Sequence, residues 1–178
     1  MVLRSFGAST GFLDNLWKQI WSLKIHLKVR HFMWQALNHS LATKEALFSP
    51  KCAADPLCPI CKENLETIEH LLLLCEWSHK VWHGSYLSLI MDPMHVTSFE
   101  ALCYSFLVED SPLEDYDKAY IACVYWNIWK TRSALVCSIV ALNPLQVIES
   151  SNATVEKHWK INCNVVPPLF CPKISIDK

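Results

Sequence analysis

Three cysteines and one histidine near the middle of the chain have the residue types and the spacing of a metal site. Cys58 and Cys61 are separated by two residues, His70 follows after eight more, and Cys75 after another four. Two thiolates on a tight loop can hold one ion while a histidine and a cysteine from a helix complete a tetrahedron, which is the geometry that Zn²⁺ adopts in proteins. Because protein atoms would fill all four positions, the spacing predicts one structural zinc ion.

Two other interpretations of these residues stay open. Free cysteine is among the residue types most often buried, so Cys61 and Cys75 could be small core residues and His70 an ordinary helix histidine. A Cys-x-x-Cys pair can also be a redox dithiol, but that motif is expected where a helix follows a strand, and a proline-rich loop precedes Cys58. The reserve ligands nearby are His79, His83 and Cys52.

The segments that must position the four side chains have helical patterns. Apolar residues recur at helical spacing over residues 12–22 and 25–38. Thr43 is expected to cap a short helix that runs to Phe48, and Pro50 marks its end. The N-terminal part of the chain therefore predicts three helices ahead of the first cysteine.

The four ligands themselves are expected on a loop and a helix. Residues 50–65 contain Pro56 and Pro59 and predict an irregular loop that carries Cys58 and Cys61. Thr67 is expected to cap a helix that runs to about Leu74 and carries His70. Another helix is predicted from Trp77 to about Ile90, with Trp82, Tyr86 and Leu89 facing inward.

The second half of the chain continues the helical pattern over residues 97–108, 116–140 and 145–160. Residues 165–178 contain three prolines followed by an alternating segment that is typical of the beginning of a strand. The predicted fold class is mostly α, with a small helical zinc-stapled module followed by a helical extension. We divide the chain into this module (12–90), the extension or linker (91–162) and a tail (163–178).

Composition supports a packed helical protein. Hydrophobic residues make up 52% of the 178 residues, with eight Trp and only three Gly, which favours a core built from helices and leaves no glycine-rich phosphate loop. Nine cysteines are an odd number, and the first residues lack a signal-peptide pattern, so we expect an intracellular protein without a disulfide framework. The apolar stretches are shorter than the roughly 18 residues of a membrane span, so no membrane partner is expected.

Charge is balanced overall but uneven along the chain. The net charge is −1, which gives no global attraction to nucleic acid. Between residues 18 and 51, however, basic residues outnumber Glu45, the one acid there. These candidate phosphate contacts are Lys18, Lys24, Lys28, Arg30, Lys44 and Lys51. Four tryptophans could stack on bases, although their helical spacing favours the core for Trp17, Trp21, Trp34 and Trp82.

Several landmarks together resemble the zinc-binding region of plant non-LTR retrotransposon reverse transcriptases. They span about residues 12–83 and comprise WKQIW (17–21), KVRHFMW (28–34), Leu41-Ala-Thr43, Leu47, Cys58-Pro-Ile-Cys61, Glu66-Thr67, His70-Leu71, Cys75 and Trp82. The resemblance implies that the ligand pattern of that family falls on Cys58, Cys61, His70 and Cys75. It also implies nucleic acid, RNA or DNA, as a partner, and the nucleus as the compartment.

A fainter resemblance follows it. Trp126-Asn-Ile-Trp-Lys-Thr-Arg132 is similar to the segment that joins this zinc region to a ribonuclease H-like domain, and residues 167–177 resemble that domain's first strand. Asp177 would then match its first metal-binding carboxylate. One carboxylate cannot hold two magnesium ions, and the paired-aspartate strand motif of a polymerase is not found, because Glu109-Asp110 and Glu114-Asp115 are typical of a solvated turn. We therefore expect no enzyme activity.

The preferred hypothesis is a non-catalytic zinc-binding module of a retroelement-derived protein that assists nucleic-acid binding by a reverse transcriptase. Its partners would include the reverse transcriptase and ribonuclease H regions of a larger product. Two alternatives remain: a zinc-stapled module that binds another protein through an apolar groove, and an inactive fragment of a ribonuclease H-like enzyme.

Overall fold

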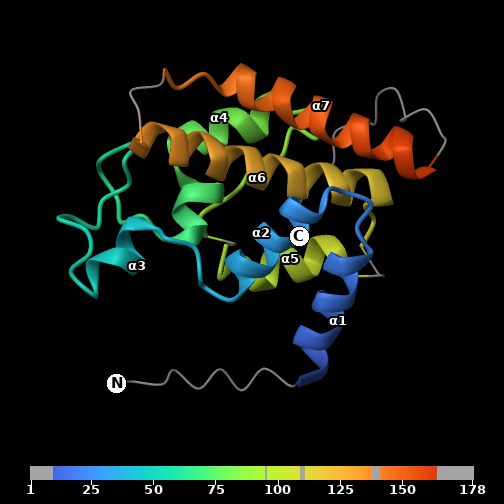
Figure 1. Cartoon of the computed structure of the whole chain (residues 1–178), viewed down its shortest axis with the longest axis horizontal. Coiled ribbons are helices and arrows are strands. Elements are labelled where there is room, and N and C mark those ends of the chain that lie inside the picture. The colour runs from blue at the N-terminus through green and yellow to red at the C-terminus, as the bar shows by residue number, and fades with distance from the viewer. Residues whose placement is uncertain (1–9, 95, 109–110, 138–140, 164–178) are drawn as a thin grey trace.

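The computed structural model describes residues 10–94, 96–108, 111–137 and 141–163, which fold into helices joined by loops (Figure 1). Within these ranges there is no strand, and the one β contact is an isolated antiparallel bridge between Leu57 and Leu65. The mostly α prediction is confirmed. The elements are α1 (Thr10–Ser22), α2 (Leu27–Leu37), α3 (Lys44–Phe48), the π-helical η1 (His70–Leu74), α4 (Glu76–Gly84), α5 (Phe99–Leu107), α6 (Asp115–Cys137) and α7 (Pro144–Cys163).

Helix α6 lies at the centre of the fold. It is 23 residues long and buries side chains on nearly every side, which is the pattern of a helix surrounded by others. It packs against α7, α2 and η1, while α4 packs on α7 and α1 packs on α2 and α5 (Figure 1). Among the described helices, none combines the length and the apolarity needed to cross a membrane.

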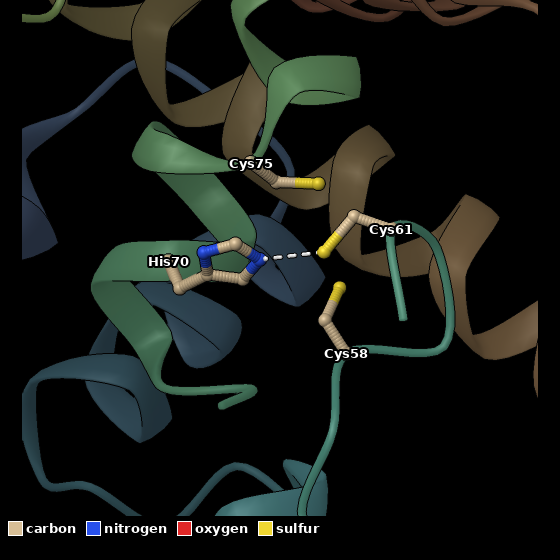
Figure 2. A group of neighbouring side chains, drawn as sticks. All are labelled: Cys58, Cys61, His70 and Cys75. Atoms are coloured by element: carbon tan, nitrogen blue, oxygen red, sulfur yellow. Dashed lines mark hydrogen bonds between the residues drawn. The ribbon is translucent and has the colours of Figure 1, made fainter. Parts of the chain in front are cut away.

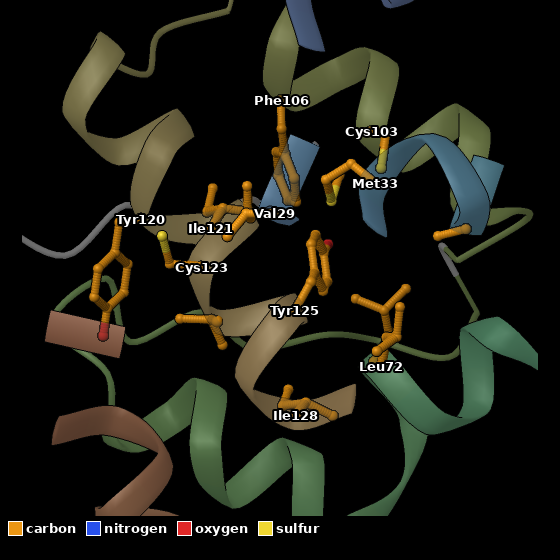
Figure 3. Packing of buried hydrophobic residues seen from close by; sticks show 14 of the residues in the cluster. Val29, Met33, Leu72, Cys103, Phe106, Tyr120, Ile121, Cys123, Tyr125 and Ile128 are labelled. Carbon is orange, nitrogen blue, oxygen red and sulfur yellow. The ribbon is translucent and has the colours of Figure 1, made fainter. Parts of the chain in front are cut away.

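One hydrophobic core joins the early and the late helices. Figure 3 shows Val29 of α2, Leu72 of η1 and Phe106 of α5 gathered around Tyr125 of α6. The Tyr125 ring makes an edge contact with the ring of Trp82, with 5.0 Å between the centroids. Since Leu72 lies between two predicted zinc ligands in the sequence, the segment that carries those ligands is part of the core.

Most of the predicted helix starts agree with the structure. Thr43 caps α3, where its hydroxyl accepts a hydrogen bond from the Ala46 amide at 3.3 Å, and α3 ends at Phe48 as predicted. His26 caps α2 by accepting from the Lys28 amide at 3.0 Å, so the predicted helix 25–38 begins two residues later than expected. A histidine is not among the preferred capping residues, which is why the sequence did not indicate this start.

The helix predicted from Trp77 to about Ile90 is wrong at its C-terminal end. Helix α4 stops at Gly84, because both the amide and the hydroxyl of Ser85 bond back to the Trp82 carbonyl, at 3.2 and 2.7 Å. Leu89 nevertheless faces the core as predicted. Gly84 is close to α7, since a Cβ there would lie 2.9 Å from Cδ1 of Ile148.

Some predictions fall on residues outside the described ranges. These include the strand predicted within residues 165–178, Asp177, and the acidic pair Glu109-Asp110. The end of the helix predicted over 116–140 also lies there, whereas its described part agrees with α6. Helices α6 and α7 pack against elements of the predicted zinc module, so contacts cross the boundary that we placed at residue 90.

A buried ion pair connects the centre of the fold to the cysteine-bearing loop. Arg132 of α6 donates from Nε to Oε1 of Glu66 at 2.7 Å and from Nη2 to Oε2 at 2.6 Å. The Glu66 side chain is fully buried and that of Arg132 is 6% exposed. The Lys44 amide at the start of α3 donates to the same carboxylate at 2.5 Å. Glu66 therefore joins α3, α6 and the loop before η1 at one point.

We expect Arg132→Met to destabilise the zinc-loaded protein by about 3–5 kcal/mol, because it leaves the Glu66 carboxylate buried without its cation. Urea unfolding followed by circular dichroism measures this free energy. The double variant Glu66→Leu/Arg132→Met removes both charges and is expected to lose less than the sum of the two single variants. Additive single losses would show that the two side chains are not coupled.

Candidate metal centre

The four predicted ligands converge on one point. Cys58, Cys61, His70 and Cys75 each offer one ligand atom, and these atoms all lie within 4.8 Å of one another. Figure 2 shows the three sulfur atoms and the imidazole facing a common centre, with 3.3 Å between Cys61 Sγ and His70 Nε2. A zinc ion with bonds of about 2.3 Å to sulfur separates tetrahedral ligands by about 3.8 Å. The donor set and its dimensions therefore suit one zinc ion.

A tight turn presents the first two ligands. The bridge between Leu57 and Leu65 brings the two ends of this turn together. Inside it, the Cys58 amide donates to the Asn64 carbonyl and the Lys62 amide donates to the Cys58 carbonyl, both at 2.8 Å. Lys62 adopts a φ of 62°, the left-handed conformation that lets the chain reverse directly after Cys61. We call residues 57–65 the knuckle.

The other two ligands are placed by a π-helix instead of the predicted α-helix. Thr67 caps the helical turn at residues 68–69 that leads into η1, because its hydroxyl accepts from the His70 amide at 3.0 Å. The Cys75 amide then donates to the His70 carbonyl five residues earlier, at 2.6 Å. Such wide turns occur mostly as single-turn insertions in α-helices, and frequently at functional sites. Here the wide turn directly joins the backbone of one ligand residue to that of the other.

Two side chains that the sequence analysis did not single out for this role complete the wide turn. The Ser78 hydroxyl donates to the Leu71 carbonyl at 2.5 Å, and the Trp82 indole donates to the Leu72 carbonyl at 2.8 Å. Both bonds are buried, and an unpaired buried carbonyl would cost about 1–3 kcal/mol. Because both donors come from α4, this helix fixes η1 and thereby His70. The sequence offered one sign of this role, because Ser78 and Trp82 are four residues apart and therefore lie on the same face of the predicted helix.

Contacts among the four ligands shift the pKa values of three of them. The Cys58 thiol donates to Cys75, and this bond together with burial raises the pKa of Cys58 to about 12. The same bond lowers the pKa of Cys75, assisted by the amides of Trp77 and Ser78 in the first turn of α4. The pKa of His70 is raised, mainly by its hydrogen bond with Cys58. Zinc binding must therefore displace at least the proton on Cys58.

The reserve ligands are not part of the cluster. Cys52 is exposed, and neither it nor His79 or His83 belongs to the group of converging ligand atoms. Cys103 and Cys123 are buried in the core, and Cys137 is exposed, so these three are core or surface thiols outside the cluster. Among the described residues, the four ligands form the one group of three or more such side chains that could hold a metal.

The six basic candidates do not form one patch. Lys18 lies on α1, whereas Lys44 and Lys51 lie in and after α3, and Figure 1 shows α1 and α3 well apart. The Arg30 guanidinium donates to the Trp21 carbonyl at 2.9 Å, which gives it a structural role. Lys24 pairs with Asp115 at 3.4 Å.

The four tryptophans separate into two kinds. Trp82 is fully buried and Trp17 packs against the core, as their helical spacing predicted. Trp21 and Trp34 are 43% and 38% exposed, so helical spacing did not place them in the core.

We expect the purified chain to contain one zinc ion, and Cys61→Ser and His70→Ala to lose it together with part of the helical structure. The reason is that a structural zinc ion contributes its binding free energy to folding. Metal analysis measures the zinc content, and circular dichroism measures the helical structure. Cys52→Ser, which removes an exposed cysteine outside the cluster, is the matched control. Less than half an equivalent of zinc in the wild type, or an unchanged fold after chelation, would contradict this expectation.

Zinc affinity should rise with pH, by about tenfold per unit for each proton released. The raised pKa of Cys58 keeps its thiol protonated near neutral pH in the metal-free protein, so acid favours the metal-free form. Calorimetric titration with Zn²⁺ in buffers of different ionisation enthalpy counts the protons released. An affinity that does not change between pH 6 and 8 would exclude this coupling.

A family comparison agrees with this geometry, and it covers less than half of the chain. Comparison with curated proteins and with solved structures gave no significant match. A family model described as zinc-binding in reverse transcriptase matches residues 7–82. Cys58, Cys61, His70 and Cys75 all fall within that segment. All four ligands of the metal centre therefore lie in a segment that matches the zinc-binding family of reverse transcriptases.

Proposed function

We propose that this chain is a non-catalytic zinc-binding module of a retroelement-derived protein, and that it assists nucleic-acid binding by a reverse transcriptase. The observation that carries the proposal is the convergence of four zinc ligands inside a segment that matches a zinc-binding family of reverse transcriptases. Plant origin and the non-LTR type are part of the proposal, and their support is the run of landmarks from Trp17 to Trp82.

The ligand set supports a structural role for the zinc ion. Catalytic zinc sites keep one position open for water or substrate, whereas this site offers four protein ligands. Cys58 and Cys75 are fully buried, and His70 is 9% exposed. A substrate would therefore meet neither a free coordination position nor an open path on these sides of the ion.

The zinc ion would stabilise the knuckle, which is held by few other contacts. The knuckle has one isolated bridge and few side chains in the core, whereas η1 is anchored by Leu72 and by the bonds from α4. Coordination would attach this weakly packed loop to the anchored helix. The proposed role is thus to hold the helices before and after the knuckle in a fixed arrangement.

The retroelement context extends the proposal to the second half of the chain. The segment from Trp126 to Arg132, which resembles a connection to a ribonuclease H-like domain, lies in the second half of α6. The tail that resembles the first strand of that domain lies outside the described residues. A reading frame that continues past Lys178 into further acidic strand motifs would favour a ribonuclease H fragment instead. A nuclear location is part of the proposal, because the resemblance to retroelement proteins implies it.

A protein-binding module is the second candidate, and exposed apolar side chains on the knuckle favour it. Leu57 and Leu65 face each other across the bridge, and they are 37% and 49% exposed. Paired apolar residues on a rigid turn can dock on another protein. In that case the zinc ion would stabilise a protein-binding surface.

We expect the zinc-loaded full chain to bind a labelled 20-nucleotide single strand, with an affinity that falls steeply between 50 and 200 mM salt. Phosphate contacts release counterions, with a slope of about −0.7 per contact for single strands, whereas apolar docking is nearly independent of salt. Fluorescence anisotropy measures the affinity at each salt concentration, and RNA and DNA strands of the same sequence give the preference. Absence of binding at 50 mM salt would contradict the proposed function.

A further inference from the structure

A basic groove lies where the start of α2, the second half of α6 and α7 meet. Its volume is about 460 Å³, within the range of about 300–1,000 Å³ that is typical of ligand sites. Its lining includes Lys28, Lys130, Lys157, His26, His158 and Trp126. Five of these six side chains are basic, and no acidic residue lines the groove.

The three lysines carry unbalanced positive charge. Lys28, Lys130 and Lys157 form no ion pair with any carboxylate of the described residues, whereas neighbouring Lys24 and Lys160 are paired with Asp115 and Glu156. Three like charges around one concave surface repel one another and raise the local potential. An anionic ligand would relieve this repulsion.

The two histidines hold two sides of the groove together. The rings of His26 and His158 are in edge contact with 5.0 Å between their centroids, which joins the start of α2 to α7. His26 Nδ1 accepts from the Lys28 amide, so it also fixes the turn that presents Lys28. Burial lowers the pKa of His158, and the nearby His26 and Lys157 lower it further. Both lysine-bearing segments are thus held in place before any ligand arrives.

Trp126 gives the groove an aromatic wall. Its ring is half-buried and packs edge-on against Phe32, with 5.6 Å between the centroids. A base can stack on an exposed aromatic surface only when it is free of its own duplex stack, and such stacking contributes about 1–3 kcal/mol per base. A concave surface that combines lysines with one indole therefore suits a single strand better than a duplex.

We propose that this groove binds the backbone of a single-stranded nucleic acid, with Lys28, Lys130 and Lys157 contacting phosphates and Trp126 contacting a base. The inference rests on the proposed function and gives it a location. Of the six basic candidates from the sequence, only Lys28 lines the groove. The groove also uses α6 and α7, which lie beyond the segment matched by the zinc-binding family.

The test compares two triple variants of the zinc-loaded full chain that lose the same charge. Lys28→Gln/Lys130→Gln/Lys157→Gln removes the groove lysines, and Lys62→Gln/Lys80→Gln/Lys118→Gln removes three lysines from the knuckle, α4 and the start of α6. For a single strand in 0.1 M salt, we expect the groove variant to bind at least about tenfold more weakly, with a salt slope smaller by about 2. The control variant should lose much less. Zinc content and circular dichroism verify that both variants are folded.

A second comparison tests the aromatic wall. Trp126→Leu should weaken single-strand binding about fivefold or more, and Trp126→Phe should retain most of it, because a phenyl ring still stacks.

The outcomes separate the two proposals. If the wild type binds no nucleic acid, both the proposed function and the groove are wrong. If the wild type binds but the two triple variants weaken binding equally, the function stands and the groove is overturned. Tighter binding of a duplex than of a single strand, lost in the groove variant, would overturn the choice of a single strand.

Discussion

The fold depends on the meeting of three thiols and one imidazole in a space of less than 5 Å. Such a group is costly to bury without a cation, because polar and ionisable side chains lose their contacts with water. The hydrogen bond with Cys75 and burial raise the pKa of the Cys58 thiol to about 12. A zinc ion would form a bond with each of the four side chains. Since few side chains of the knuckle reach the core, coordination would be the main interaction that holds it against η1.

Two groups of buried hydrogen bonds connect the metal centre to the rest of the molecule. Ser78 and Trp82 bind the free carbonyls of η1, so α4 determines where His70 lies. Glu66, which lies between the knuckle and η1, accepts two hydrogen bonds from the Arg132 guanidinium, so α6 determines where the knuckle ends. The metal centre and the central helix are therefore positioned by each other, and the same helix α6 contributes Trp126 and Lys130 to the groove.

The sequence was informative where one local pattern determines the structure. The ligand set followed from spacing, and the caps at Thr43 and Thr67 followed from residue type. The π-helix could not be predicted in this way. The leucines of residues 71–74 are equally compatible with backbone hydrogen bonds between residues four apart, as in an α-helix, and five apart, as in a π-helix. The early end of α4 depends on the hydrogen bonds of Ser85 with the Trp82 carbonyl. A serine at this place does not by itself indicate the end of a helix. The groove brings Lys28 together with Lys130 and Lys157, which follow it by more than a hundred residues in the sequence, and no periodicity can indicate such a contact.

The Glu66–Arg132 pair has a consequence for what counts as one unit of this protein. A family comparison recognises residues 7–82, yet a polypeptide cut at residue 82 would keep the acid and discard its cation, together with the α6 surface that covers Leu72. Such a fragment could still chelate metal through its own four ligands, but it would leave an unneutralised carboxylate and uncovered leucines. The segment that matches the family model is thus shorter than the segment whose side chains build the core around it.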